Sequence, residues 1–446
     1  MSFPRYPAYK DSGVEWLGEV PEHWSLQKLK SIVSFSGGGT PSRENLAYWN
    51  GDIPWVSPKD MKIECIVGAE ESITEEGLRS STSNLLPPGR VLMVVRSGIL
   101  KHTIPVAINE TAIALNQDMK ALNFDAKKCV SRFFLRWVQG HNDQLLLAWA
   151  KQGATVESIE HTYLAETVMP LPGIAEQSQI ATFLDRETAK IDTLVAEQRR
   201  LMALLKEKRQ AVISHAVTRG LNPLAPLKPS SIEWLGDVPE HWETRTIAKA
   251  STKITNGFVG PTRDILVDAG TPYIQATHIK NGRVNFDDGY FVRPDWSAAH
   301  SKSILCEGDV LIVQTGAGTG DVGLVSENEV GYNCHALIIV APDKSLLHGT
   351  YLSAVLQSTY GQEKLTSIET GAMHPHLNCG EVKFVDLPLP PLAEQLRIVS
   401  YINMSADQFD TLTAEAQRAI DLLQERRTAL ISAAVTGQID VRGVLQ

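Results

Sequence analysis

Apolar residues follow two patterns along this chain. Between residues 25 and 168 they form short runs broken by glycine and proline, which is typical of β-strands: residues 53–56, 91–95 and 104–108. Residues 131–138 instead have the spacing of a helix. Residues 243–386 repeat this mixture. Both stretches therefore predict compact bodies that combine strands with helices.

After Pro172 and after Pro391 the pattern becomes helical over a long stretch. Alternate steps of four and three residues trace a seam typical of a coiled coil, with the members Ile180, Leu184, Glu187, Ile191, Leu194, Gln198, Leu201, Leu205, Lys208 and Val212. The seam 218 positions later has the members Ile398, Ile402, Ser405, Phe409, Leu412, Ala416, Ala419, Leu423, Arg426 and Leu430. The polar members Glu187 and Ser405, and Lys208 and Arg426, occupy equivalent positions, and we expect them to fix register and direction.

These seams predict two helices of about 40 residues, each roughly 60 Å long. Because both copies keep the seam at the same register, we expect the helices to pair antiparallel, with one body at each end. The alternative is two independent amphipathic helices, each packed on its own body.

The chain contains two copies of one plan. Residues 15–24 recur as residues 233–242, displaced by 218 positions and different only at Glu19 and Asp237. The same displacement relates residues 170–180 to residues 388–398, and residues 211–218 to residues 429–436. A period this long indicates a duplicated domain-sized unit, since solenoid repeats have periods of up to about 50 residues.

The duplication predicts seven segments and a pseudo-twofold symmetric protein of the α+β class. The seven segments are an N-terminal arm (1–24), a first α/β body (25–168), a central long helix (169–220), a linker with the second copy of the arm (221–242), a second α/β body (243–386), a distal long helix (387–437) and a C-terminal tail (438–446). Proline-rich residues 222–229 read as a semi-rigid extended linker.

Composition narrows the class of protein. The chain has 446 residues, 43% hydrophobic and 21% charged, which describes an ordinary soluble globular protein. No apolar run is long enough to span a membrane, and residues 1–10 lack the apolar core of a signal peptide, so we expect a cytoplasmic protein without membrane contact. Five scattered cysteines suit a reducing compartment. The net charge of −9 argues against a protein that coats nucleic acid by itself.

Motifs of catalysis and cofactor binding are weak. Residues 318–323 match the glycine pattern of dinucleotide-binding loops, but strands rather than a helix are expected next, so a loop joining strands is favoured. Residues 381–383 with Pro342 and Asp343 fit a nuclease signature poorly, and an edge strand leading into Pro388 is favoured there. Because no phosphate loop, nucleophile setting or metal-ligand spacing is found, we expect no catalytic residue and no metal site.

Polar residues on matching loops are the more suggestive candidates. In the first body they follow the strands at Trp55 and Val91: Ser57, Lys59, Lys62, Arg96, Ser97, Lys101 and His102. In the second body the counterparts are Gln275, Thr277, His278, Lys280, Gln314 and Thr315. These side-chain types can hydrogen-bond base edges or hold phosphates. Each alone is more often a solvated loop residue, but different polar residues at equivalent positions favour two different recognition surfaces.

Together these motifs resemble the DNA-specificity subunit of type I restriction-modification systems. The resemblance covers essentially the whole chain. It rests on residues 15–18 and 20–24 with their copy, on residues 51–56 with residues 59–61, and on residues 170–172 and 175–177 with their copy, each running into a long helix.

The resemblance implies a function for each part. The bodies would be target-recognition domains that each read half of a bipartite sequence in double-stranded DNA, and the paired helices would hold them apart. Two modification subunits, which bind S-adenosylmethionine and methylate adenine at N6, would dock on this chain, and restriction subunits using ATP and magnesium would be able to join them. This chain itself would have neither catalytic residues nor cofactor.

Other classes of function remain as alternatives. A stand-alone nuclease or methyltransferase is one, although the Asp/Asn-Pro-Pro-Tyr/Phe motif of adenine methylases is missing from both Pro-Pro pairs, at residues 87–88 and 390–391. A non-catalytic protein–protein scaffold, or a degenerate DNA-binding paralogue of the same fold, is the other.

Overall fold

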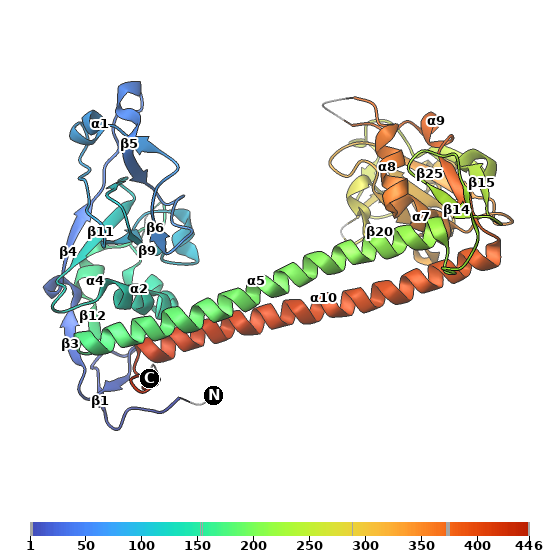
Figure 1. The fold of residues 1–446 in the computed structure, drawn as a ribbon. Helices are drawn as coiled ribbons and strands as arrows, with labels where there is room; N and C mark the ends of the chain where they lie inside the picture. Colours follow the sequence, from blue (N-terminus) through green and yellow to red (C-terminus); the bar gives the residue numbers. More distant parts are fainter. Residues whose placement is uncertain (1–2, 152, 154, 288, 372–374, 445–446) are drawn as a thin grey trace. The chain divides into compact units, whose positions relative to one another are not determined.

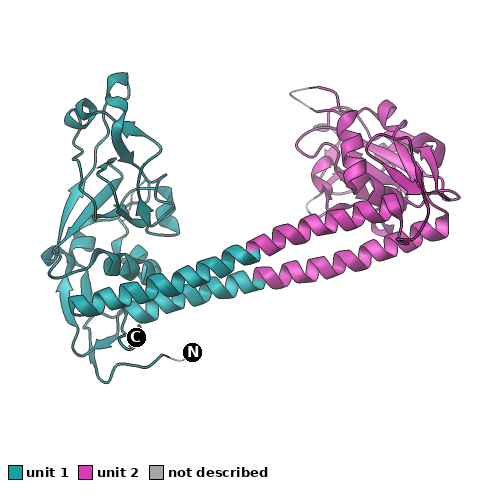
Figure 2. Ribbon diagram, in the orientation of Figure 1, with its two compact units in different colours: residues 1–198, 418–446 teal, residues 199–417 magenta. Residues whose placement is uncertain are grey.

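The computed structural model describes residues 3–151, 153, 155–287, 289–371 and 375–444 (Figure 1). The chain forms two compact units: unit 1 comprises residues 1–198 and 418–446, and unit 2 comprises residues 199–417 (Figure 2). The boundary cuts both long helices, so each unit holds one body and part of each helix.

Unit 1 begins with the arm. Strands β1 (Tyr9–Asp11) and β2 (Glu19–Pro21) pair antiparallel, and β3 (Ser25–Lys28) then pairs antiparallel with β12 (Val168–Leu171). The β3–β12 pair joins the two ends of the first body immediately before the long helix.

The first body holds two sheets. The five-stranded sheet has the order β4 (Val33–Gly37), β11 (Met119–Phe124), β8 (Val91–Val94), β9 (Val106–Asn109), β6 (Cys65–Ile66). The three-stranded sheet has the order β10 (Ala114–Leu115), β5 (Trp49–Val56), β7 (Ser72–Ile73). Every residue of β8 is buried, as expected of an apolar central strand. The strands predicted near residues 53–56, 91–95 and 104–108 are therefore confirmed.

Helices of the first body pack beside these sheets. They are α1 (Glu75–Arg79), α2 (Ser131–Gly140), α3 (Asn142–Trp149) and α4 (His161–Glu166), with the 3₁₀ turns η1 (Leu29–Ser31), η2 (Leu46–Tyr48) and η3 (Gly98–Lys101). Helix α2 buries Phe133, Phe134 and Trp137 completely in the core of the body. It confirms the helix predicted at residues 131–138.

Unit 2 repeats the plan. Its paired strands are β13 (Leu227–Pro229) with β14 (Asp237–Pro239), and β15 (Glu243–Thr246) with β26 (Asp386–Leu389). A six-stranded sheet has the order β16 (Ser251–Asn256), β25 (Leu337–Pro342), β22 (Val310–Val313), β23 (Val322–Leu324), β20 (Gly282–Val284), β19 (Ile279–Lys280). A four-stranded sheet has the order β17 (Leu266–Val267), β21 (Tyr290–Val292), β18 (Thr271–Ile274), β24 (Asn333–Cys334).

The short helices of unit 2 complete the second body. They are α6 (Pro294–Ala299), α7 (Gly349–Gln357), α8 (Thr359–Ser367) and α9 (Cys379–Val382), with the 3₁₀ turns η4 (Ile247–Ala250), η5 (Ala276–His278), η6 (Ser301–Ser303) and η7 (Glu327–Glu329). The structure thus confirms the α+β class and the duplication of the body.

Local predictions for unit 2 have mixed outcomes. The glycine-rich residues 318–323 do lie between strands: residues 318–321 lead into β23, the antiparallel neighbour of β22, and residues 322–323 belong to β23. The edge strand predicted at residues 381–383 is wrong: Asn378 caps the short helix α9, and the strand starts only at Asp386. Residues 222–229 are also more ordered than a linker, because residues 227–229 form β13, the counterpart of β1.

Helices α5 (Ile174–Arg219) and α10 (Leu392–Val435) are the long helices predicted from periodicity. The predicted seam is correct at every second position, such as Ile191 and Leu205, which are buried. In the middle of α5, the positions between are wrong by one residue: Leu194 is 45% exposed, whereas Val195 is 8% exposed. The predicted members Ile180 and Ser405 are buried. The actual seam therefore runs through residues 184, 188, 191, 195, 198, 202 and 205.

The shifted seam changes which polar residues join the helices. Lys208 and Arg426 are exposed. Their neighbours form the interhelix ion pairs: Arg209 with Asp410 at 2.7 Å in unit 2, and Arg427 with Asp192 at 2.9 Å in unit 1. These pairs are equivalent under the displacement of 218, and they show the same antiparallel register of α5 and α10 within each unit.

The repeated sequence motifs meet at the start of each long helix. In unit 1, Glu176 accepts hydrogen bonds from Trp24 Nε1 at 3.1 Å and from the Tyr6 hydroxyl at 2.7 Å, and it lies 2.9 Å from His23 Nε2. In unit 2, Glu394 lies 2.8 Å from His241 Nε2 and accepts from Trp242 Nε1 at 3.2 Å.

The neighbouring glutamine fastens the body to the same helix end. Gln177 accepts a hydrogen bond from the Val130 amide at 2.8 Å and donates to the Lys128 and Pro172 carbonyls, each at 2.9 Å. Gln395 makes the equivalent bonds to His348, Leu346 and Pro390. The Ala-Glu-Gln motif therefore joins arm, body and helix in each copy.

Among the described residues, no helix is both long and apolar enough to cross a membrane. Both long helices contain many charged residues.

Candidate nucleic-acid interface

In the first body, the two loops that carry the candidate residues meet at one turn. Strand β5 ends at Val56, whose carbonyl accepts a hydrogen bond from the Asn116 amide at 3.0 Å. Strand β8 ends at Val94, and the next amide, that of Val95, donates to the Asp118 carbonyl at 2.8 Å. The turn at residues 116–118 therefore brings both loops to the same edge of the body.

The second body builds the same edge from different residues. The Ile274 carbonyl, at the end of β18, accepts from the His335 amide at 2.8 Å. Val313, at the end of β22, pairs with Leu337, the first residue of β25. The turn at residues 335–336 lies between them. Ala336 has φ of 43°, which few residues other than glycine adopt without strain.

A side chain caps the loop after the first of these strands in both bodies. Asp60 accepts from the Ser57 amide at 2.8 Å and from the Ser57 hydroxyl at 2.9 Å. In the second body, His278 Nδ1 accepts from the Gln275 amide at 2.8 Å. Asp60 and His278 are equivalent under the displacement of 218, so the same turn is closed by a carboxylate in one body and by an imidazole in the other.

The structure brings the candidates of the first body to this edge and to the neighbouring turn η3. Five of the seven are exposed: Lys59, Lys62, Arg96, Lys101 and His102. Lys62 lies 3.7 Å from Glu70, and both side chains are exposed. Among the described residues, Lys59, Arg96 and Lys101 have no carboxylate at ion-pairing distance. Their positive charges are therefore not neutralised by a direct ion pair with any described residue.

Ser57 and Ser97 are half-buried, and both take part in local structure. The Ser57 hydroxyl donates to Asp60, and the Ser97 hydroxyl accepts from the Ile99 amide at the start of η3. Arg96 is held by its backbone, which forms an isolated β-bridge with Ser158.

In the second body, only part of the predicted set faces outward. Thr277, Lys280 and Thr315 are exposed and Gln275 is half-buried. His278 is 6% exposed because it closes the turn. Gln314 is 5% exposed, and its Nε2 lies 3.4 Å from Asn256 Oδ1. These two side chains shape the edge rather than present a surface to solvent. Contact of the remaining residues with DNA stays a prediction.

Sequence reasoning missed a stacked arginine in the first body. The guanidinium of Arg43 lies 3.8 Å from the ring centre of Trp49 and 5.2 Å from that of Trp55, and its Nη2 donates to Glu71 at 2.9 Å. The ion pair with Glu71 raises the pKa of Arg43 and lowers that of Glu71. Only Trp55 belonged to a recognised motif, so sequence alone gave no signal for the stack.

Another missed feature is a pair of basic groups near the shared turn. Lys120 Nζ lies 3.3 Å from His161 Nδ1. Burial lowers the pKa of Lys120, and burial together with the nearby Lys120 charge lowers that of His161. The pair combines strand β11 with helix α4, which lie too far apart in sequence to form a motif.

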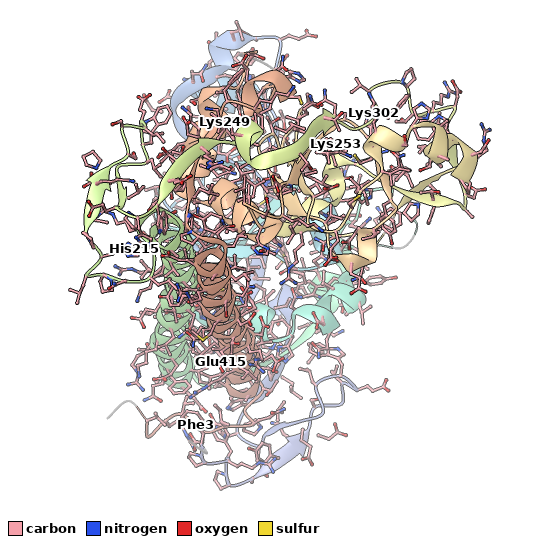
Figure 3. The ribbon with its side chains drawn as sticks, turned by 90° about the vertical axis from the view of Figure 1, so that its right-hand side faces the viewer. Phe3, His215, Lys249, Lys253, Lys302 and Glu415 are labelled. Carbon is pink, nitrogen blue, oxygen red and sulfur yellow. The ribbon has the colours of Figure 1, made fainter. Side chains whose placement is uncertain are left out.

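The second body also carries lysines that no motif indicated. Lys249, Lys253 and Lys302 belong to η4, β16 and η6 of unit 2 (Figure 3). Lys253 Nζ donates to the Lys302 carbonyl at 3.2 Å. Within the described part of the chain, none of the three forms an ion pair. They add positive charge to a protein whose net charge is −9.

An aromatic cluster supports the turn of the second body. Trp296 stacks on His300 with ring centres 4.0 Å apart, and Phe258 packs edge-on against both rings. The Tyr273 hydroxyl lies 3.3 Å from His335 Nδ1. Burial lowers the pKa of His335, which favours its neutral form beside the apolar rings.

The site has the chemistry of recognition. Its exposed groups are amines, a guanidinium, an imidazole and hydroxyls, with the half-buried amide of Gln275 beside them, and such groups suit contacts with phosphates and base edges. Among the described residues, no group of three or more His, Cys, Asp or Glu side chains is placed to hold a metal ion.

Comparison with known proteins places both halves of the chain in one family. The model of the type I restriction modification DNA specificity domain matches residues 21–201 and again residues 235–421.

Curated relatives agree with this match. The specificity subunit of the type I restriction enzyme EcoR124I/EcoR124II from Escherichia coli is 35% identical over 188 residues, which cover 42% of this chain and 43% of that protein. The MjaIX specificity subunit from Methanocaldococcus jannaschii is 22% identical over 437 residues, 95% of each chain.

Solved structures show the same fold. A chain from a structure on complex assembly and conformational transition of the type I R-M system superposes with a TM-score of 0.71, at 16% identity, over 93% of this chain and 98% of that chain. The HsdS subunit from Thermoanaerobacter tengcongensis superposes with a TM-score of 0.52, at 15% identity, over 94% and 98%.

Proposed function

Because this chain belongs to the family of type I restriction-modification DNA specificity subunits and has two DNA specificity domains, we propose that each body reads one half of a bipartite DNA sequence. The observation that carries this proposal is that both bodies form the same edge at the ends of equivalent strands, β5 and β8 in the first body and β18 and β22 in the second. Its backbone geometry is repeated, while the exposed residues differ: Lys59 corresponds to Thr277, and Arg96 corresponds to Thr315.

In this proposal the exposed polar side chains of the two edges contact base edges, and nearby lysines contact phosphates. Direct readout requires donors and acceptors at the groove, whereas phosphate contacts fix position and orientation. The lysines of the second body, Lys249, Lys253 and Lys302, would serve the latter role. Half-sites read from one face of B-DNA lie about 34–36 Å apart, one helical turn, a distance that long helices can span.

We further propose that two modification subunits dock on equivalent surfaces of this chain. Unit 1 exposes Leu194 of α5 and Leu422 of α10, and unit 2 exposes Leu412 of α10 and Leu204 of α5. Leu194 corresponds to Leu412, and Leu204 to Leu422. A duplicated pair of exposed apolar residues suits two copies of one partner. The modification subunits would hold S-adenosylmethionine, and restriction subunits would join as a further partner.

Adenine methylation tests this proposal. The chain would be co-expressed with the modification subunit of its own system in a host without adenine methylation, and N6-methyladenine would be mapped across the genome. A single bipartite motif with a fixed gap is expected. A stable complex without methylation would favour the protein scaffold instead, and the absence of any complex would contradict the subunit assignment.

A further inference from the structure

A network of charged side chains around the buried Arg136 joins the first body to the long helices. The Arg136 side chain, on α2, is 2% exposed. Its Nη1 lies 2.7 Å from Glu64 Oε1, and its Nη2 lies 2.7 Å from Asp185 Oδ1 on α5. Arg132 Nε, one turn earlier on α2, lies 2.9 Å from Asp185 Oδ2. Both arginines of α2 therefore form ion pairs with Asp185.

Helix α10 contributes a third arginine. Arg427 Nη2 lies 3.6 Å from Glu64 Oε1, and Arg427 Nε lies 2.9 Å from Asp192 Oδ1. Burial alone would raise the pKa of Glu64. The charge of Arg136 and the hydrogen bonds donated by Gln139 and Arg136 together outweigh burial, so the pKa is lowered. Glu64 is therefore held as a carboxylate between a helix of the body and a helix of the coiled coil.

Glu64 ends the segment that carries two of the exposed candidates. Residues 57–64 follow β5, and Asp60 holds the segment by accepting from the Ser57 amide at 2.8 Å and from the Glu70 amide at 2.8 Å. Lys59 and Lys62 lie between Ser57 and Glu64. The segment is thus fixed at one end by Asp60 and at the other by the charge network.

The second copy lacks this network. The residues equivalent to Glu64, Arg132, Arg136 and Asp185 are Gly282, Thr350, Ala354 and Asn403. In unit 2 these four line a cavity of about 400 Å³, together with Arg209 and Asp410. Among the described residues of unit 2, no ion pair joins α7 to either long helix. The body is held there by neutral hydrogen bonds, such as Gln210 Nε2 to the Gln357 carbonyl at 2.7 Å.

We propose that Arg136, Glu64 and Asp185 are positioning residues that fix segment 57–64 and so set how strictly the first body discriminates its half-site. The second body discriminates without such a network. This inference rests on the proposed function, because it assigns a role to residues that hold a recognition segment. None of the three residues contacts DNA in this proposal; they act by limiting the movement of Lys59 and Lys62.

A reciprocal exchange tests the inference. Asp185→Asn gives copy 1 the residue of copy 2, and Asn403→Asp is the matched control at the equivalent position. Glu64→Gln removes the other carboxylate with little change of shape. Each chain would be assayed, in complex with its modification subunits, on duplexes that carry single-base substitutions in either half of the target.

Discrimination in the half read by the first body should fall by about fivefold or more in Asp185→Asn and Glu64→Gln, because a segment that can move also accommodates mismatched base pairs. Discrimination in the other half should not change, and Asn403→Asp should change neither half. Equal loss in both halves, or unchanged discrimination in the first, would overturn the inference.

Amide hydrogen exchange of the full chain without DNA separates this inference from the proposed function. Asp185→Asn should exchange faster at residues 57–64 and not at the equivalent residues 275–282. Unchanged exchange at residues 57–64 would overturn the positioning role. A wild-type complex that methylates no bipartite sequence would overturn the proposed function, and with it the effect on discrimination, while the exchange result still decides whether the network holds the segment.

Discussion

His141 is a buried base in unit 1, beneath a tryptophan of the repeated motif. Its side chain is 3% exposed, and Trp16 packs edge-on against it with ring centres 5.3 Å apart. Nδ1 donates to the Trp137 carbonyl at 2.8 Å, and Nε2 has no partner among the described residues. Burial lowers the pKa of His141 from 6.5 to about 4.

This pKa shift predicts a pH-dependent loss of stability. Between pH 6.5 and about 4, His141 is neutral in the folded protein but protonated in the unfolded chain. The free energy of unfolding is therefore unaffected by His141 above pH 6.5 and decreases as the pH falls to about 4. The loss should reach about 3 kcal/mol, at about 1.4 kcal/mol per pH unit. Urea unfolding of the wild type and of His141→Phe at pH 7 and pH 4 would measure it; an equal pH dependence in both proteins would contradict the assignment.

Glu176 should contribute more to the stability of the folded protein than its counterpart Glu394. Glu176→Ala would leave the Trp24 indole and the Tyr6 hydroxyl without their acceptor, at about 1–3 kcal/mol for each buried donor. Leu224, which is 89% exposed, stands at the position equivalent to Tyr6, so in Glu394→Ala the Trp242 indole loses its acceptor without a buried tyrosine beside it. The exposed His241 also loses its partner, as His23 does in Glu176→Ala. Thermal unfolding of the two variants should show the larger decrease in Tm for Glu176→Ala, and a larger decrease for Glu394→Ala would contradict this view.

At the scale of residues, the sequence showed which groups recur but not what they contact. Trp24, His23 and Glu176 all lay in repeated motifs, yet their meeting required the fold. Glu64 and Arg136 are 72 positions apart and belong to no pattern. His278 looked like a recognition residue because its role in closing a turn, which Asp60 also has, is visible only in the structure.

The paired helices illustrate the limits of periodicity at the scale of elements. In α5, the predicted seam and the actual seam both contain leucine residues. The actual seam also includes the polar Thr188, which is 2% exposed. Counting apolar residues therefore selected Leu194 over Val195. The existence of the helices and their antiparallel pairing within each unit were predictable, because those depend on the repeated pattern and not on its phase.

Paired substitutions on α5 test the corrected seam. Val195→Asp places a charge at a buried position and should lower the Tm strongly, because a buried unpaired charge costs several kcal/mol. Leu194→Asp changes an exposed neighbour and should leave the Tm nearly unchanged. Thermal unfolding followed by circular dichroism distinguishes them, and a larger loss for Leu194→Asp would restore the seam predicted from sequence.

The exposed leucines also test the proposed docking surfaces. Leu194→Asp and Leu412→Asp should each weaken binding of the modification subunit while the chain stays folded. Leu46→Asp is the control, since Leu46 is 80% exposed but lies in the first body, away from the helices. Analytical ultracentrifugation would show fewer bound subunits per chain, and an unchanged complex for both helix variants would exclude these surfaces.

At the scale of the whole molecule, the duplication was the strongest signal, because identical motifs at a constant displacement need no structural model. The division into two units was harder to predict from the sequence. Unit 1 includes both chain ends: the Asp440 amide donates to the Pro4 carbonyl at 2.7 Å, and the Tyr9 hydroxyl donates to the Gly437 carbonyl at 2.9 Å. Residues 438–444 are therefore part of the first unit rather than a separate tail.

Gly437 shows why this closure needs a particular residue. It has φ of 74°, and a Cβ atom there would lie 2.4 Å from the Pro21 ring. Helix α10 can therefore end against the arm only with glycine at this position. Gly220 ends α5 with the same φ sign beside Trp242, which gives the second unit an equivalent closure.

The central claim is that each body reads its own half of one DNA target. Its most direct test is to replace residues 25–168 with the corresponding body of another specificity subunit and to map N6-methyladenine again. One half of the motif should change while the other half and the gap stay the same. A change in both halves, or an unchanged motif, would contradict it.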